Sequence, residues 1–465
     1  MLKMIHGDPE KKEVRAWLEE AEKKKTDDFE VSFDRALFPA PFSSRLEYNS
    51  PAHGPWNIVH TGMLIPGAHQ IYVCAANCCR GVVLTAAEME ASDRFSSVEV
   101  KEEDIYSGEM EDLVIEGVAD ILEKLPVRPT AVLLFTVCLH HFMGCDLSYI
   151  YDTLRSRFPN QHFVDCYMDC INQKEGLTPD QKLRISMYSL LEPGKIRQGQ
   201  VSVLGGDLPM IPENEAFKMI RKNGGTVKDI TETDCFDEYL SLGESPLMLC
   251  FYPPGKPGAE ITAQKTGARL LYMPMPYVYE QIDRQLSELA AALGLPSREE
   301  EALFDLEEKK RSCDRALEKT AAAIREAGME VVLDISAVPH VLGLARLLLE
   351  HGFPVSRIYA DAFFPEEKEH FDWIRVHAPG LRICSVIHPA MRLYHNTSDR
   401  RVLAVGQKAA YFHQTPHFVN MVEGGGLYGY AGILALCRDM EKALKEEKDT
   451  ADLVVRKGLG CACCL

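Results

Sequence analysis

Cysteine side chains are the residues of this sequence best suited to do chemistry, and a group of them stands close together. Cys74, Cys78 and Cys79 lie within one short stretch, next to Asn77 and Arg80 rather than inside an apolar run. A turn or a helix there places Cys74 and Cys78 on one side. The stretch lacks the repeated C-x2-C pairs of a zinc site, whereas iron–sulfur clusters accept thiolates from separate loops. Two interpretations remain from the residues alone: ligands of an iron–sulfur cluster, or buried and reactive thiols.

A second group of candidate residues follows a predicted buried strand. The apolar run 132–137 ends at Cys138, and His140 and His141 come directly afterwards. Parallel α/β sheets present their strand ends to ligands, so Cys138 is a candidate partner of the 74–79 thiols. Imidazole titrates near neutral pH, which makes His140 and His141 candidate proton donors. The alternatives are a core cysteine and ordinary hydrogen-bonded loop histidines.

The other cysteines among the 15 give weaker signals. Cys250 ends a predicted strand further along the chain and is a candidate ligand there. Cys166 and Cys170 follow another strand and favour structural roles, although a second site is an alternative. The C-terminal segment contains three further thiols, at Cys461, Cys463 and Cys464. It is either a tail that binds metal or sulfur, or a disordered tail whose thiols have no function. Structural thiols on helix or strand faces are predicted at Cys235, Cys313, Cys384 and Cys437.

Composition limits the partners and the location. The chain has 51 basic and 69 acidic residues and a net charge of −18. A surface this acidic repels polyanions, so nucleic acid is excluded as the default partner. The sequence contains no apolar run long enough to cross a membrane, and its charged N-terminus lacks the apolar core of a secretion signal. An odd number of cysteines without a disulfide framework is typical of reduced thiols in the cytoplasm.

The elements that must position these residues alternate between strand and helix along the 465 residues. Buried parallel strands are predicted at 132–137, 162–167, 247–251 and 330–335, among others, and a long amphipathic helix is predicted over 298–327. This order predicts three Rossmann-like, doubly wound α/β domains with parallel sheets. The predicted divisions are an N-terminal helix and irregular arm, three α/β domains and a cysteine-rich tail, at 1–49, 50–195, 196–297, 298–447 and 448–465.

Two common nucleotide-binding motifs are absent from the sequence. No G-x-x-x-x-G-K-S/T loop is present, so this chain is not expected to hydrolyse ATP itself. No G-x-G-x-x-G follows a predicted strand, and Gly424–Gly426 comes after a polar loop instead. A nicotinamide site therefore has little support.

Several segments together resemble the nitrogenase component 1 superfamily. That group includes the catalytic subunits of nitrogenase, their cofactor-assembly scaffolds and the light-independent protochlorophyllide reductase. The resemblance extends from about residue 50 to 440 and implies the three-domain fold of that family. It rests on Leu64-Ile65-Pro66 running into Cys74–Cys79, Glu103–Gly108, Thr136-Val137-Cys138, Gly144-Cys145-Asp146, Leu427–Gly432 and Ala435–Met440.

The resemblance implies an iron–sulfur cluster, of the four-iron type or larger, in the first α/β domain. Cys78, or its neighbour Cys79, and Cys138 match the family's second and third cluster cysteines. The family's first cysteine is expected near residues 50–53, where this sequence has none. There are three alternatives: Cys74 substitutes for the missing cysteine, His53 is a ligand, or the site holds a simpler four-iron cluster. The predicted ligand set is Cys74, Cys78, Cys79 and Cys138.

The resemblance also implies a second site and a set of partners. Cys250 falls where the family binds its active-site cofactor, and His417 is the candidate near the family's histidine position. A second metallocofactor or an organic substrate is therefore predicted near Cys250. The predicted function is an iron–sulfur electron-transfer or catalytic subunit of a nitrogenase-like reductase, paired with a second component 1-like subunit. A separate ATP-hydrolysing iron–sulfur protein supplies its electrons. The alternatives are a cofactor-assembly scaffold without turnover and a metal-free structural or sensory relative.

Overall fold

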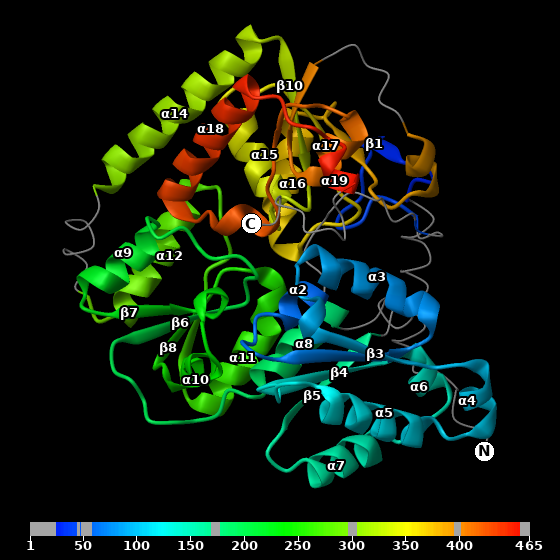
Figure 1. The fold of residues 1–465 in the computed structure, drawn as a ribbon. Coiled ribbons are helices and arrows are strands. Elements are labelled where there is room, and N and C mark those ends of the chain that lie inside the picture. The colour runs from blue at the N-terminus through cyan, green and yellow to red at the C-terminus, as the bar shows by residue number, and fades with distance from the viewer. Residues whose placement is uncertain are drawn as a thin grey trace, which may run out of the picture.

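The computed structural model describes residues 25–43, 47, 58–168, 177–295, 305–394 and 401–455. It contains three β-sheets, which lie at the lower right, the lower left and the top of Figure 1. The prediction of an α/β protein with three parallel-sheet domains is confirmed. Most of the predicted N-terminal helix, His53, Cys170 and the cysteines of the tail lie outside the described residues.

The first sheet has the strand order β3-β2-β4-β5, and every neighbouring pair is parallel. The apolar run that predicted a buried strand forms β4, which is buried along its whole length. The carboxyl ends of β2 and β4 are side by side, so the residues after them meet at one edge. The strands are β2 (His69–Cys74), β3 (Phe95–Glu99), β4 (Ala131–Val137) and β5 (His162–Met168).

Helices of the first domain cover both faces of this sheet. Helix α8 begins at a capping box, in which Thr178 Oγ1 accepts from the Gln181 amide and Gln181 Oε1 accepts from the Thr178 amide. That start fixes the helix that presents Asp180, Lys182 and Arg184 to the sites described below. The helices are α2 (Ile58–Gly62), α3 (Ala76–Glu88), α4 (Glu102–Ser107), α5 (Met110–Lys124), α6 (Cys138–Phe142), α7 (Leu147–Arg157) and α8 (Pro179–Tyr188).

The second sheet is also fully parallel, in the order β7-β6-β8-β9. Its strands are β6 (Gln200–Leu204), β7 (Thr226–Asp229), β8 (Leu247–Cys250) and β9 (Arg269–Tyr272). Its helices are α9 (Glu215–Lys222), α10 (Phe236–Ser241), α11 (Lys256–Thr266) and α12 (Tyr279–Ala292).

The third sheet has the order β1-β12-β11-β10-β13-β14 and contains a strand that the sequence did not reveal. The N-terminal arm supplies β1, which pairs antiparallel with β12 at the sheet edge. Strand pairing over such a separation is a tertiary event, and three residues give no local signal for it. The strands are β1 (Glu30–Ser32), β10 (Met329–Asp334), β11 (Val355–Tyr359), β12 (Arg382–Cys384), β13 (Arg401–Val405) and β14 (Phe418–Val419).

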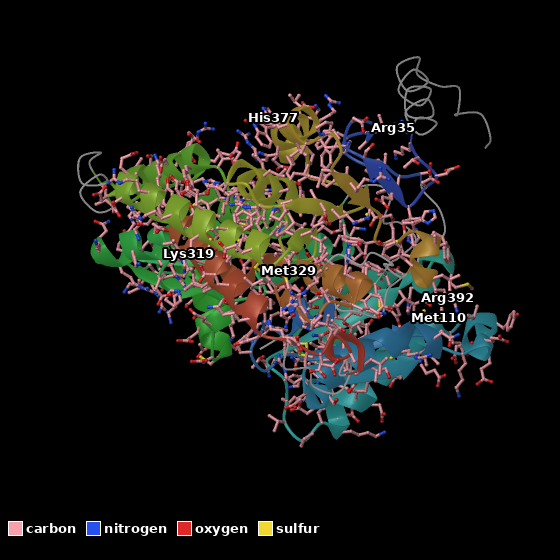
Figure 2. The ribbon with its side chains drawn as sticks, turned by 90° about the horizontal axis from the view of Figure 1, so that it is seen from above. Arg35, Met110, Lys319, Met329, His377 and Arg392 are labelled. Atoms are coloured by element: carbon pink, nitrogen blue, oxygen red, sulfur yellow. The ribbon has the colours of Figure 1, made fainter. Side chains whose placement is uncertain are left out.

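The long predicted helix forms α14, although its first predicted residues are not described. It packs against α18 (Gly429–Lys445), where Lys319 (labelled in Figure 2) donates to Glu441 Oε1 at 2.9 Å. The helices of this domain are α14 (Leu306–Glu326), α15 (Val341–Glu350), α16 (Lys368–His377), α17 (Gln407–His413), α18 (Gly429–Lys445) and α19 (Asp452–Val455). No described helix is both long and apolar enough to cross a membrane.

Shared hydrophobic cores join the three domains. One cluster of buried residues combines Leu249 of the second sheet with Leu333 of the third. Another combines Leu133 of the first sheet with Met248 of the second. Because the second domain contributes to both clusters, we expect it not to unfold without disturbing its neighbours.

Candidate functional site

Thiols from two separate loops meet at the carboxyl edge of the first sheet. Cys74 ends β2, Cys78 and Cys79 follow on the first turn of α3, and Cys138 begins α6 directly after β4. Since β2 and β4 are neighbours, both loops leave the sheet at the same edge. Cys138 lies close enough to Cys78 to affect its ionisation, and Cys74 shares a side-chain hydrogen bond with Cys79. We call these four residues the thiol group.

Members of the thiol group differ in exposure and in acidity. Cys78 is exposed, Cys79 and Cys138 are partly exposed, and Cys74 is buried. Burial raises the pKa of Cys74 to about 12, with further contributions from Cys79 and Cys78. Burial, Cys138 and Cys79 together also raise the pKa of Cys78. Without a metal these two thiols therefore keep their protons at neutral pH, and metal binding would release them.

The arrangement suits some metal centres better than others. Within the described parts of the chain, no three His, Cys, Asp or Glu side chains are placed to bind one metal ion. A single zinc ion, which needs four ligands around one point, therefore has no support there. An iron–sulfur cluster is larger, and its cysteines bind different irons, so its ligands stand further apart. The chemistry of the thiol group fits such a cluster, with Cys78 and Cys138 near each other on separate loops.

His140 and His141 lie beside the thiol group and line a pocket of about 300 Å³. His140 is buried, and its Nδ1 accepts a hydrogen bond from the backbone N–H of Val137 at 3.1 Å. Burial lowers the pKa of His140, so its ring is neutral at pH 7. His141 is exposed. The structure thus brings together two of the three histidines that the sequence singled out.

Cys250 lies in a different, closely packed environment. It is fully buried at the end of β8, and its thiol donates to the carbonyl oxygen of Tyr252 at 3.3 Å. Burial raises the pKa of Cys250 to about 12. Gly205 lies so near that a Cβ on it would be 2.8 Å from Cys250 Sγ. The thiol is therefore enclosed by protein atoms on this side.

Arg184, which is completely buried, occupies the junction of the three domains next to Cys250. It donates to Asp180 Oδ1 at 3.1 Å and to Asp207 Oδ2 at 2.8 Å, and its guanidinium lies over the ring of Tyr252 at 5.4 Å. Burial alone would lower the pKa of Arg184, but the two carboxylates raise it, so the side chain is charged. Tyr252 in turn donates to Glu423 Oε1 of the third domain at 3.2 Å. This junction network ties loops of all three domains together.

A small cavity lies beside the junction network. Its volume is about 10 Å³, which is room for about one water molecule. It is lined by residues that include Asp207, Asp229, Tyr252, Met275 and Glu423. Buried oxygens of two of them, Asp207 Oδ1 and Asp229 Oδ2, have no hydrogen-bond partner among the described residues.

Substituting Asp229 with Asn is expected to weaken the pH dependence of stability. Burial raises the pKa of Asp229 from 3.8 to about 6, although the hydrogen bonds from Thr231 oppose the shift. Between these values the folded protein holds a proton that the unfolded chain releases, so stability falls as pH rises. The decrease in the free energy of unfolding that is attributable to Asp229 is roughly 2–3 kcal/mol. Urea unfolding at about pH 4 and pH 7 measures it, and Asp229→Asn should show less decline than the wild type.

The exposed Asp234 provides a control for this measurement. Asp234→Asn changes the same chemical group without removing a buried carboxyl, so its decline should equal that of the wild type. An equal decline in Asp229→Asn as well would contradict the assignment of the proton to Asp229.

His417 is placed apart from the other candidate residues. It is buried just before β14, at the edge of the third sheet. Its Nδ1 lies 3.0 Å from the carbonyl oxygen of Ala443 in α18, and its Nε2 lies 3.3 Å from Arg401 Nη2. These contacts hold the ring against α18, and neither involves Cys250.

Most of the remaining cysteines have structural surroundings. Cys166 is fully buried in the first sheet, so a ligand role for it has no support in its surroundings. The sequence predicted a structural thiol on a helix or strand face at Cys235. In the structure Cys235 is exposed and lies directly before α10. Buried thiols in hydrophobic cores are found, as predicted, at Cys313, Cys384 and Cys437.

Sequence reasoning missed the polar residues that surround both cavities. Tyr167 lies at the carboxyl end of β5 and Asp207 follows β6, so the rule applied to Cys138 would have marked them too. Asp180 and Arg184 stand at i and i+4 on α8, a spacing that usually indicates a surface ion pair. Only the packing of three domains around Arg184 shows that this pair is internal.

Comparison with known proteins is consistent with this geometry. A model of the family described as nitrogenase component 1 type oxidoreductase matches residues 59–445. The chain belongs to this family. The fold of the nitrogenase component 1 family is also seen in the solved structure titled "Nitrogenase Cp1 at pH 6.5", with a TM-score of 0.62 and 13% sequence identity. The similarity covers 87% of this chain and 94% of that one.

A second solved structure shows the same nitrogenase component 1 fold. It is titled "Nitrogenase Cp1 at pH 5" and has a TM-score of 0.56, with 12% identity over 95% of this chain and 96% of that one. No curated protein matches the sequence. At identities this low, structural similarity establishes the fold alone. The chemistry therefore has to be argued from the residues of this chain.

Proposed function

We propose that this chain is the electron-transfer subunit of a nitrogenase-like reductase and that its thiol group binds an iron–sulfur cluster. The observation that carries the proposal is the meeting of Cys78 and Cys138 from two loops at one sheet edge. Cys79 and Cys74 are the further ligands, and Cys74 would need to lose a proton that its burial holds. When bound, such a cluster accepts and passes on electrons.

Exposed apolar side chains near the thiol group support a subunit partner. Val83 and Leu84 on α3 are each 42% exposed, and Phe142, on α6 with Cys138, is 62% exposed. Large apolar residues around an open ligand site are typical of a surface that another protein covers. We propose that a second component 1-like subunit covers this face and helps to enclose the cluster.

The electron donor in this proposal is a separate ATP-hydrolysing iron–sulfur protein. The sequence has no phosphate-binding loop of its own, which is consistent with ATP hydrolysis on another chain. His140 and His141 lie between the thiol group and the 300 Å³ pocket, where they would contact a substrate. His417, held against α18, is not part of the proposed site.

The second cofactor site that the family resemblance implied does not fit the residues around Cys250. Among the described residues, the Cys250 thiol is fully buried against Gly205, and the cavity of about 10 Å³ beside the junction network is too small for a metallocofactor or an organic substrate. We therefore propose that the thiol group, and not Cys250, is the redox site among the described residues.

Replacing Cys138 with Ala tests the proposed cluster. Anaerobically purified wild-type protein should contain iron and sulfide and give the paramagnetic resonance signal of a reduced cluster. Cys138→Ala should lose most of the iron and the signal, because one thiolate ligand is gone. Cys235→Ala, which removes an exposed thiol elsewhere, should keep both.

Other outcomes would favour other functions. Wild-type protein without iron or sulfide would indicate a metal-free relative, and an unchanged signal in Cys138→Ala would contradict the ligand assignment. Transfer of the cluster to an acceptor protein, without reduction of any small molecule, would indicate an assembly scaffold.

A further inference from the structure

The pocket beside the thiol group has the position and size of a small-molecule site. It lies at the carboxyl ends of the neighbouring strands β4 and β5, where parallel α/β sheets bind their ligands. Its volume of about 300 Å³ is at the lower end of the range for small-molecule pockets. The lining comes from four consecutive elements of the first domain and from α8, and includes Thr136, His140, His141, Leu147, Tyr167 and Lys182.

One buried hydrogen-bonding atom in this lining lacks a partner. His140 is only 1% exposed, and its Nε2 is buried without a hydrogen-bond partner among the described residues. His140 Nδ1 lies 3.1 Å from the backbone nitrogen and 3.3 Å from the carbonyl oxygen of Val137, and the shorter contact, in which Nδ1 accepts, puts the ring proton on Nε2. A buried donor that is left unpaired destabilises the protein, and a ligand with an acceptor atom would remove that penalty.

The charge of the lining selects the kind of acceptor. Lys182 lines the pocket and forms no ion pair with any described residue, and the described lining residues include no Asp or Glu. Two acidic groups near this sheet edge have partners: Glu111, whose charge also acts on His140, accepts from the amide of Asp146 through Oε1, and Asp165 pairs with Arg155. In a chain with a net charge of −18, a pocket whose described lining carries one lysine and no acidic side chain favours an anion.

We propose that this pocket binds a small molecule through an oxyanion, either a carboxylate or a phosphate group. Lys182 supplies the positive charge, His140 Nε2 donates a hydrogen bond, and the Tyr167 hydroxyl is a further donor. The apolar side of Leu147 contacts the rest of the molecule. Since Cys138 begins α6 at the edge of this pocket, the ligand would lie beside the thiol group. Its role as a substrate rests on the proposed function, whereas its binding does not.

Calorimetric titration of the full chain with inorganic phosphate and with malonate tests the proposal. At least one of the two anions should bind to the wild type, and the stronger of them identifies the group that the pocket takes. Lys182→Met should weaken binding by about tenfold or more, because a charged hydrogen bond is lost. Tyr167→Phe should weaken it less, and Lys195→Met, which removes an exposed lysine elsewhere, should bind like the wild type.

Two results of the titration would overturn the proposal. If neither anion binds, or if Lys182→Met binds as tightly as Lys195→Met, the pocket is not an oxyanion site. Repeating the titration with Cys138→Ala separates this inference from the proposed function. If Cys138→Ala loses the cluster but still binds the anion, both the proposed function and the oxyanion site are supported. If the wild type contains the cluster but binds neither anion, only the oxyanion site is contradicted.

Discussion

Replacing Arg184 with Met is expected to destabilise the protein by about 3–5 kcal/mol. The guanidinium is fully buried and pairs with Asp180 and Asp207, so its removal leaves Asp207 as a buried carboxylate without a counter-charge. The stacking over Tyr252 is lost as well. Equilibrium unfolding in urea measures the change in the free energy of unfolding.

A matched surface pair and a double variant make this prediction specific. Arg197 pairs with Glu244 but is 57% exposed, so Arg197→Met should change stability by about 1 kcal/mol or less. Adding Asp207→Asn to Arg184→Met removes the uncompensated charge and should recover part of the loss. If Arg184→Met is no more harmful than Arg197→Met, the junction network does not hold the three domains together.

Replacing Gly255 with Ala is expected to cost about 3 kcal/mol or more. A Cβ on Gly255 would lie 2.2 Å from Gly205 Cα, a backbone atom that cannot move aside without shifting the end of β6. The same contact encloses Cys250, because Gly205 also borders its thiol. The free energy of unfolding of the variant, compared with the wild type, measures this close approach.

Gly81 provides the control for this glycine substitution. It lies within α3, and a Cβ there would meet no atom within 4 Å. Alanine favours the helical backbone more than glycine does, so Gly81→Ala should stabilise the protein by about 0.5–1 kcal/mol. Similar effects of the two substitutions would contradict the close packing around Cys250.

Local sequence patterns were enough to predict the parallel sheets. The run 132–137 became β4 because a short uninterrupted apolar segment is typical of a strand that is buried on both faces of a sheet. The predicted helix 298–327 became α14 over the residues described. Strand β1 escaped prediction because its partner β12 is more than three hundred residues away. The positions of Cys78 and Cys138 after strands pointed to one sheet edge by the same local logic.

What the sequence determined by itself is the alternation of strands and helices, the family and the thiols available for a cluster, since each depends on residue types and short spacings. The tertiary structure alone decided that Arg184 is internal, that Cys250 is enclosed and that His417 faces α18. It also placed Lys182 and Tyr167 in one pocket with His140. These features depend on which loops of three domains come into contact, and burial and charge pairing exist only once those contacts have formed.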